Sequence, residues 1–323
     1  MKIKATLDRI PGGMMVVPLL LAATINTLAP DLLRIGNFTE ALFVKSASAL
    51  IALFLLCAGS QINVRNVGTA FAKGASLLIL KWAIGAAVGL IAYIVAGSDG
   101  LFIGLTPLAI IAAMTNSNGG LYVAIVGQYG KADDKAAYSL LALNDGPFLT
   151  MVALAIFGAM GFVEGFFSIV SFISVLLPIV VGMILGNADE DMRAFLAKGS
   201  DMLIPFFAFS LGMGINFTAI ISGGAAGVLL GILTVLLTGG CGYLLFKALG
   251  WNPIVGAAEG STAGNAVATP MAIAAANQVF APVAKLATVQ VAASTVTTAI
   301  LLPLFISFLV KTFGAPKDTG AED

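Results

Sequence analysis

Long apolar runs, each separated from the next by a short polar segment, dominate this chain. Most of the runs contain the ~20 residues that an α-helix needs to cross a lipid bilayer. The pattern therefore predicts an all-α polytopic membrane protein with ten transmembrane helices. The predicted spans are residues 14–30, 47–62, 74–96, 101–128, 136–162, 166–185, 202–217, 223–249, 254–280 and 286–310.

Composition agrees with a membrane location and removes several kinds of chemistry. Hydrophobic residues make up 59% of the chain and charged residues 10%, too little polar surface for a soluble protein of this length. Cys57 and Cys241 fall singly within predicted spans, which favours neither a disulfide nor a metal site. The chain has no histidine, so we expect proton transfer to depend on carboxylates.

The positions of lysine and arginine predict the orientation. With ten spans and a cytoplasmic N-terminus, only Arg34, Lys45 and Lys285 fall in loops on the outer side, and Lys81 falls within a span. All other lysines and arginines lie on the cytoplasmic side, as the positive-inside rule requires. We therefore expect both termini in the cytoplasm, and a nine- or eleven-helix arrangement would remove this asymmetry.

The two halves of the sequence resemble each other. Residues 45–63 align without a gap on residues 198–216, and residues 112–119 align on residues 257–264. Helix two thus matches helix seven, and helix four matches helix nine. Each half has five spans, so the copies must have opposite orientations in the membrane, as in many secondary transporters. Chance similarity between apolar helices is less consistent with matched ends and matched breaks. We expect repeats at 1–162 and 163–323.

Two polar, glycine-rich segments interrupt the fourth and ninth spans. An unpaired backbone group in hydrocarbon costs several kcal/mol, so a broken helix at that depth must be buried in protein or face a polar cavity. Small polar residues also permit close helix packing, but two clusters at matched positions favour a binding site. The predicted substrate-binding residues of these breaks are Asn116, Ser117, Asn118, Gly119, Gly120, Ser261, Thr262, Gly264 and Asn265.

The charges within the spans restrict the substrate. Lys81 is the only basic residue predicted inside the membrane. We expect its long stem to carry the ammonium back to the cytoplasmic surface, and a buried position as a partner of Asp145 is the alternative. A multiply charged phosphate would then lack its usual cationic partners. A small monoanion with several hydroxyl groups fits better, bound at the facing N-termini of the half-helices that follow the breaks.

Two acidic residues are candidates for binding a coupling ion. Asp145 lies well inside the fifth predicted span, and Glu259 directly precedes the second break. Carboxylates in a membrane are costly, and those that occur usually face the interior of the bundle, where they titrate or bind a cation. Helix ten carries Gln290, Ser294 and Thr298 at helical spacing, and we expect this polar stripe to face the breaks. Gln290 and Ser294 are therefore added to the predicted substrate site.

Several short blocks together resemble a known family. They are Ile10-Pro-Gly-Gly-Met-Met15, Asn118-Gly-Gly-Leu-Tyr122, Gln128-Tyr-Gly130, Ile204-Pro-Phe-Phe-Ala-Phe209 and Ala266-Val-Ala-Thr-Pro270. In this order they resemble the 2-keto-3-deoxygluconate permeases, bacterial carriers that take up a sugar acid together with protons. The plan is more distantly similar to the bile acid and arsenite transporter superfamily, in which broken helices four and nine cross.

The resemblance implies a transport mechanism as well as a fold. A core domain of helices 3–5 and 8–10 would move against a panel domain of helices 1–2 and 6–7. The expected function is proton-coupled uptake of 2-keto-3-deoxygluconate, or a similar sugar acid, across the bacterial inner membrane. The resemblance implies carboxylates in some relatives where this chain has Thr115 and Asn144, and Glu259 resembles the sodium-binding region of bile acid carriers. Sodium-coupled transport of an organic anion is thus the alternative.

Two other function classes fit less well. An intramembrane enzyme would need paired aspartates, a base such as histidine or a cluster of metal ligands, and the sequence predicts only Asp145 as a deep aspartate. A channel would not require inverted repeats with acidic residues at their centre. We expect no cofactor and no metal, and the partners should be a sugar acid and the lipid bilayer, with no nucleic acid. The sequence leaves monomer and homodimer both open.

Overall fold

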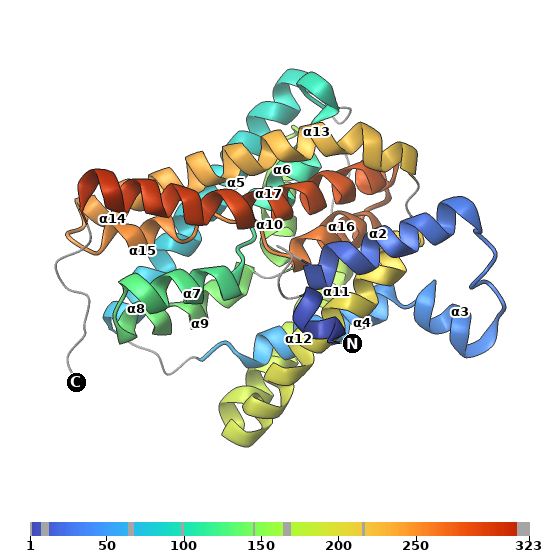
Figure 1. Ribbon diagram of the computed structural model, residues 1–323, viewed down its shortest axis with the longest axis horizontal. Helices are drawn as coiled ribbons and strands as arrows, with labels where there is room; N and C mark the ends of the chain where they lie inside the picture. The colour runs from blue at the N-terminus through green and yellow to red at the C-terminus, as the bar shows by residue number, and fades with distance from the viewer. Residues whose placement is uncertain are drawn as a thin grey trace.

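The computed structural model describes residues 2–7, 13–63, 68–97, 100–144, 146–163, 169–214 and 217–314. Within these ranges the chain forms helices and connecting turns without any strand (Figure 1). The predicted coupling residue Asp145 lies outside the described residues.

Several helices have the length and apolar composition to cross a membrane. They are Thr69–Ala96, Glu190–Gly212, Gly223–Ala248 and Gln278–Phe313. Two bent pairs of helices are each long and apolar enough when the pair is taken as one span: Asn37–Phe43 with Ala47–Ser60, and Pro107–Met114 with Gly119–Tyr129. Shorter apolar helices are Val16–Leu28, Phe148–Ala159, Leu176–Ala188 and Asn265–Ala276. The described residues thus confirm an all-helical fold whose apolar helices are compatible with a membrane protein, whereas the ten-span inverted repeat remains a prediction.

One group of helices comes from the first and middle parts of the chain. It contains α2 (Gly13–Leu28), α4 (Ala47–Ser60), α11 (Ile169–Ala188) and α12 (Glu190–Gly212), which pack against one another. The short helices α1 (Ile3–Leu7) and α3 (Asn37–Phe43) lie beside this group. The α4 and α11 backbones approach very closely: a Cβ atom on Gly182 would lie 1.9 Å from the carbonyl oxygen of Leu56.

A second group surrounds the two breaks. Its long members are α5 (Thr69–Ala96), α13 (Phe217–Thr234) and α17 (Ala281–Phe313), and α13 packs along α17 (Figure 1). The π-helical segment η3 (Val235–Gly239) joins α13 to α14 (Gly240–Ala248). The shorter members are η1 (Phe102–Gly104), α6 (Pro107–Met114), α7 (Gly119–Tyr129), α15 (Pro253–Ala257), η4 (Asn265–Ala268), α16 (Thr269–Ala276) and η5 (Gln278–Phe280).

The fifth predicted span is not one helix, so that part of the prediction was wrong. After the short helix α8 (Ala132–Ala136), this span is divided into α9 (Tyr138–Leu141), η2 (Ala142–Asn144) and α10 (Phe148–Ala159). Gly146 has φ +84°, outside the helical region, and Pro147 has no amide hydrogen to continue a helix. The interruption brings Asn144 to the end of a short 3₁₀ turn beside the first break.

Candidate functional site

The first break separates α6 from α7. Residues 115–118 are not helical, and α7 begins at Gly119 with Asn118 as its N-cap, whose side-chain oxygen accepts a hydrogen bond from the Leu121 amide at 3.0 Å. Two side chains bond to the preceding turn: Thr115 Oγ1 to the carbonyl of residue 111 at 2.7 Å, and Asn116 Nδ2 to the carbonyl of residue 112 at 2.8 Å. The predicted helix break is therefore present.

The second break separates α15 from α16. Residues 258–264 are not helical, and the chain resumes as the 3₁₀ turn η4 before α16 begins at Thr269. The α-helical N-terminus expected directly after this break is thus displaced to Thr269. Thr262 joins the break to α17, because its amide donates to Thr298 Oγ1 at 3.0 Å and its hydroxyl shares a hydrogen bond with Ser294 Oγ at 2.8 Å.

The two breaks are in direct contact. The Asn118 amide donates a hydrogen bond to Ser261 Oγ at 3.0 Å. Ser117 Oγ also donates to Oε1 of Glu259, a residue of the second break. The structure therefore brings together two segments that are more than a hundred residues apart in the sequence.

Glu259 lies at the centre of this contact with only 1% of its surface exposed. Its Oε1 also accepts a hydrogen bond from Asn144 Nδ2 at 3.2 Å, and the same amide group donates to Ser117 Oγ at 2.7 Å. Its second oxygen, Oε2, has no hydrogen-bond partner among the described residues. Because a buried, unsatisfied carboxylate oxygen is costly, Oε2 is a site where a proton or a cation would be stabilised.

Lys81 of α5 does not extend to the surface, so the expectation drawn from its stem length was wrong. Its side chain is 1% exposed, and Nζ donates to the carbonyl oxygens of Glu259 at 2.6 Å and Ser261 at 2.5 Å. The helix break explains this position, because carbonyls released from a helix in a membrane need other donors. The ammonium group therefore lies against the backbone of the residue that carries the buried carboxylate.

The other predicted residues of the breaks lie in or next to this contact region. Gly119 packs against Tyr138, since a Cβ atom there would lie 2.2 Å from its ring, whereas Gly120 has more space. Asn265, which follows Gly264, is buried in η4. The side-chain oxygens of Asn116 and Asn265 have no hydrogen-bond partner in the described part of the chain. Such acceptors match a ligand that offers hydroxyl groups.

The polar stripe on α17 is divided between two places. Ser294 and Thr298 bond to the second break, as expected. Gln290 instead accepts hydrogen bonds from the amide and hydroxyl of Thr106 and donates to the Gly104 carbonyl at 2.6 Å. Gln290 therefore holds the N-terminus of α6, the helix that ends at the first break. No role was predicted for Asn144, although its position next to Asp145 was a usable signal.

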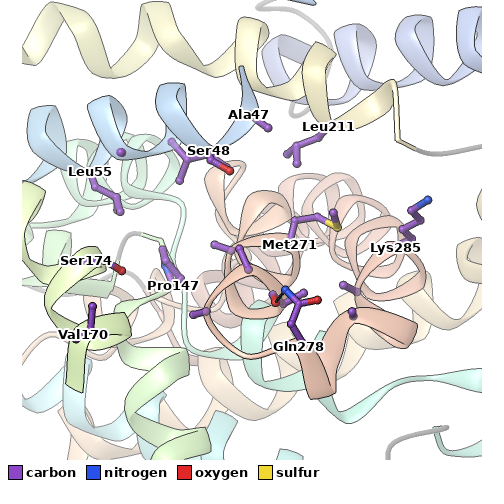
Figure 2. Close-up of a pocket in the computed structure, with 18 residues that line it drawn as sticks. Ala47, Ser48, Leu55, Pro147, Val170, Ser174, Leu211, Met271, Gln278 and Lys285 are labelled. Carbon is purple, nitrogen blue, oxygen red and sulfur yellow. Dashed lines mark hydrogen bonds between the residues drawn. The ribbon is translucent and has the colours of Figure 1, made fainter. Parts of the chain in front are cut away.

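A cavity of about 610 Å³ lies between the two helix groups (Figure 2). Residues of α4 and α11 form one wall, and residues of α16, η5 and α17 form the other. Its lining is mainly apolar, with Ser48, Ser174, Gln278 and Lys285 as polar members. No predicted substrate-binding residue lines it, but Pro147, close in sequence to Asn144, does.

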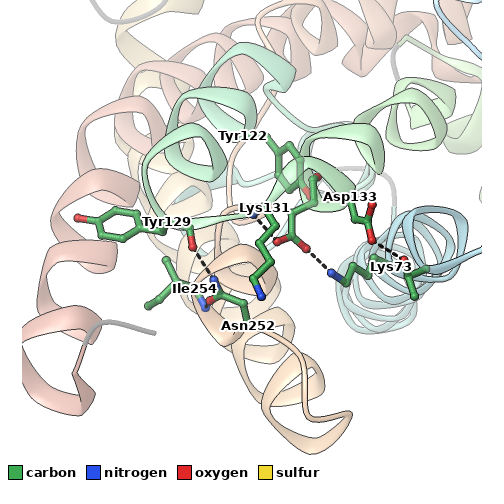
Figure 3. Close-up of polar contacts among 9 residues, drawn as sticks. Lys73, Tyr122, Tyr129, Lys131, Asp133, Asn252 and Ile254 are labelled. Atoms are coloured by element: carbon green, nitrogen blue, oxygen red, sulfur yellow. Dashed lines mark hydrogen bonds and ion pairs between the residues drawn. The ribbon is translucent and has the colours of Figure 1, made fainter. Parts of the chain in front are cut away.

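A polar cluster holds the end of α7 that lies away from the break (Figure 3). Lys73 of α5 forms an ion pair with Asp134 at 2.6 Å, and the Tyr122 hydroxyl donates to the backbone carbonyl of Asp134 at 3.0 Å. Asn252 Nδ2 donates to the Tyr129 carbonyl at 2.6 Å, which connects α7 to the start of α15. Both broken spans are therefore tied together at the cluster as well as at their breaks.

Comparison with known proteins identifies close relatives. The family model described as 2-keto-3-deoxygluconate permease matches residues 4–315. The chain is 50% identical over 311 residues to 2-keto-3-deoxygluconate permease 1 of Salmonella typhimurium, which covers 96% of each chain. It is 41% identical over 311 residues to the 2-keto-3-deoxygluconate permease of Bacillus subtilis, covering 94% of this chain and 92% of that one.

Proposed function

Because this chain belongs to the 2-keto-3-deoxygluconate permease family, we propose that it imports 2-keto-3-deoxygluconate, or a closely similar sugar acid, together with protons. Members of this family are transporters rather than enzymes, and the chain is accordingly a membrane transport protein. The names of these relatives supply the substrate class for the proposal.

The observation that carries the proposal is the direct contact between the two breaks around a buried carboxylate. Ser117 and Asn144 stabilise one oxygen of Glu259 and leave Oε2 without a partner. Protonation would satisfy this oxygen and remove the charge, which favours movement through a low-dielectric region. Glu259 is thus the proposed coupling residue, and Asp145 is the second candidate. A sodium ion at Oε2 is the alternative that the sequence analysis left open.

The sugar acid is proposed to bind at the breaks. Its hydroxyl groups would donate to the unpartnered oxygens of Asn116 and Asn265, and its carboxylate would bind at the first turn of α7, where the helix dipole favours an anion. The eleven residues of α7 form a regular helix behind this turn. These contacts agree with a hydroxylated monoanion and require no arginine.

Alternating access is supported by the grouping of the helices. The described residues of α2, α4, α11 and α12 contribute nothing to the hydrogen bonds between the breaks, whereas the second group contains both breaks, Lys81 and α17. We propose that the second group moves against the first. The cavity between them, with Lys285 at its edge, would be the route by which the substrate approaches the breaks from the outer side of the bacterial inner membrane.

Transport in proteoliposomes tests this proposal. An imposed pH gradient, acid outside, should drive accumulation of radiolabelled 2-keto-3-deoxygluconate, and a protonophore should abolish it. A sodium gradient at equal pH should have no effect. Accumulation driven only by a sodium gradient would mean that sodium, and not a proton, is the coupling ion. No accumulation under either gradient would contradict coupled uptake.

Asp145→Asn and Glu259→Gln separate the two candidate coupling residues. We expect Glu259→Gln to abolish accumulation driven by a pH gradient and Asp145→Asn to retain it. The reverse pattern would assign the coupling proton to Asp145. Protein amounts in the vesicles and the thermal stability of each purified variant provide the control for folding.

A further inference from the structure

Two oppositely charged residues are buried in contact at the centre of the site, and they come from different halves of the chain. Lys81 lies on α5 and bonds to the backbone of Glu259, which lies within the second break. A buried ion without compensation costs several kcal/mol, so the two charges depend on each other. The proton-coupling role of Glu259 alone leaves the function of Lys81 unexplained.

The geometry keeps Lys81 in place whatever the state of the carboxylate. Its Nζ donates to the backbone carbonyls of Glu259 and Ser261, not to a side chain that could lose its charge. The Glu259 carboxylate, in contrast, is held by two neutral donors, Ser117 Oγ and Asn144 Nδ2. The ammonium is therefore held by backbone carbonyls, which do not titrate. The carboxylate can accept a proton on Oε2 while Oε1 keeps its hydrogen bonds from Ser117 and Asn144.

Other charged groups near the pair are compensated separately. Asp134, which packs near Tyr122, is paired with Lys73 at 2.6 Å. Tyr122 contributes a neutral hydroxyl that donates to a backbone carbonyl. Among the described residues, Lys81 and Glu259 thus determine the net charge of the site when the carrier reorients.

We propose, on the premise of the proton symport above, that Lys81 is a fixed counter-charge that makes both reorienting forms of the carrier neutral. In the empty carrier the Lys81 ammonium balances the ionised Glu259. In the loaded carrier Glu259 is protonated, and the ammonium balances the carboxylate of the sugar acid. A proton alone would leave one net positive charge, and the sugar acid alone one net negative charge.

The half-loaded forms are penalised because each would carry an uncompensated charge through a low-dielectric region. This penalty enforces one proton for each monoanionic sugar acid and prevents leakage of either. Transport should therefore be electroneutral in each reorienting step. Lys81 is a positioning residue in this scheme, and it disfavours dianions, because a dianion would leave the protonated, loaded form with a net negative charge.

Two variants that each remove one charge of the pair test the proposal, because they should differ in substrate exchange. In Glu259→Gln the loaded form is neutral but the empty form is positive. Exchange of external for internal substrate should therefore proceed within about threefold of the wild-type rate, while net uptake driven by a pH gradient falls about 100-fold. In Lys81→Gln the loaded form is negative, so exchange should also fall about 100-fold. Glutamine can still donate to the released carbonyls, so this change removes mainly the charge.

Three further variants complete the experiment. Lys81→Arg keeps the positive charge and should retain both activities to within about tenfold. Lys81→Gln combined with Glu259→Gln should lose the exchange that Glu259→Gln alone retains. Lys247→Gln, on the exposed surface of α14, is the control and should retain wild-type exchange and uptake.

The outcomes separate the two proposals. If the wild-type protein shows no uptake driven by a pH gradient, the proposed function fails before the charges are considered. If the wild type transports but Lys81→Gln exchanges substrate normally, Lys81 is only a structural hydrogen-bond donor and the counter-charge proposal is wrong. Loss of exchange in Glu259→Gln would also overturn the counter-charge proposal. The same holds if Asp145→Asn, and not Glu259→Gln, is the variant that keeps exchange and loses net uptake. Binding of substrate to each variant, measured by thermal stabilisation, identifies those that are folded.

Discussion

The two breaks are built alike in one respect and differently in another. Each connects to the final helix of its own half through a pair of hydroxyls, Thr115 with Thr150 at 2.9 Å and Thr262 with Ser294 at 2.8 Å. The first break, however, satisfies its neighbouring carbonyls with its own side chains. The carbonyls of the second are held by Lys81 from the other half.

This difference concerns where the charge lies. The first break is neutral, while the second carries the carboxylate and attracts the ammonium. A repeat with equal breaks would bury either two carboxylates or none. The asymmetry allows one break to bind the coupling ion while the other supplies neutral donors and the N-terminus of α7. The two breaks should therefore respond differently to comparable substitutions.

The largest difference is expected in helix packing near the breaks. A Cβ atom on Gly256, just before the second break, would lie 2.1 Å from the Gly242 carbonyl oxygen, where only backbone movement can relieve the clash. A Cβ on Gly89 would meet the Ile111 side chain of α6, which can rotate. We expect Gly256→Ala to cost about 3 kcal/mol and Gly89→Ala about 1 kcal/mol. Thermal unfolding of the purified proteins measures both, and equal costs would contradict the packing argument.

Asn144 is the next most sensitive position, because its side chain supports both breaks at once. Its Nδ2 donates to Ser117 Oγ and to Glu259 Oε1, and its Oδ1 accepts from the Ser117 amide at 3.3 Å. Asn144→Ala should lower transport at least about tenfold, since hydrogen bonds to a charged group contribute about 1.5–3 kcal/mol each. Initial uptake rates in proteoliposomes measure the effect.

Thr150→Val is the matched control for Asn144→Ala. It removes a hydroxyl contact of the first break and does not touch the carboxylate. Its effect on transport should be about threefold or less. A larger loss in this variant than in Asn144→Ala would mean that the first break, and not the carboxylate, limits transport.

The hydroxyl pairs provide a smaller and more symmetrical test. A double-mutant cycle of Thr262→Val with Ser294→Ala should give a coupling energy of about 1 kcal/mol in thermal stability. The cycle of Thr115→Val with Thr150→Val should give a similar value, since both contacts are buried and their lengths differ by only 0.1 Å, 2.9 Å against 2.8 Å. A clear inequality would show that the likeness of the two breaks does not extend to energetics.

The sequence predicted the breaks because their residue types have few other uses in an apolar span. Polar and glycine residues at Asn116–Gly120 and Ser261–Asn265 could not continue a lipid-facing helix. The contact of the α17 stripe with the second break followed from helical spacing, and Ser294 confirms it. Gln290 lies on the same stripe, but spacing gives no register along a neighbouring helix, so its bonds to Thr106 and Gly104 could not be foreseen.

Other features depended on contacts between distant parts of the chain. The position of Lys81 was predicted wrongly from the length of its side chain and its distance to the surface. The side chain is instead held by the carbonyls that the second break releases. Those carbonyls lie 178 and 180 residues further along the chain. The interruption of the fifth span could have been predicted, since Gly146-Pro147 is a strong helix-breaking pair.

The smallest expected effect lies at the edge of the cavity, where the asymmetry between the halves continues. The cavity wall from the second half carries Lys285, which is exposed on α17, and the wall from α4 carries no charge. An exposed lysine attracts an anion mainly before binding, and salt screens this attraction. Lys285→Gln should therefore raise KM about threefold at low salt and leave the maximal rate unchanged. Arg34→Gln removes an exposed charge from the first half and should not alter KM. If both variants raise KM equally, the attraction is a property of the whole surface and does not depend on the cavity wall formed by the second half.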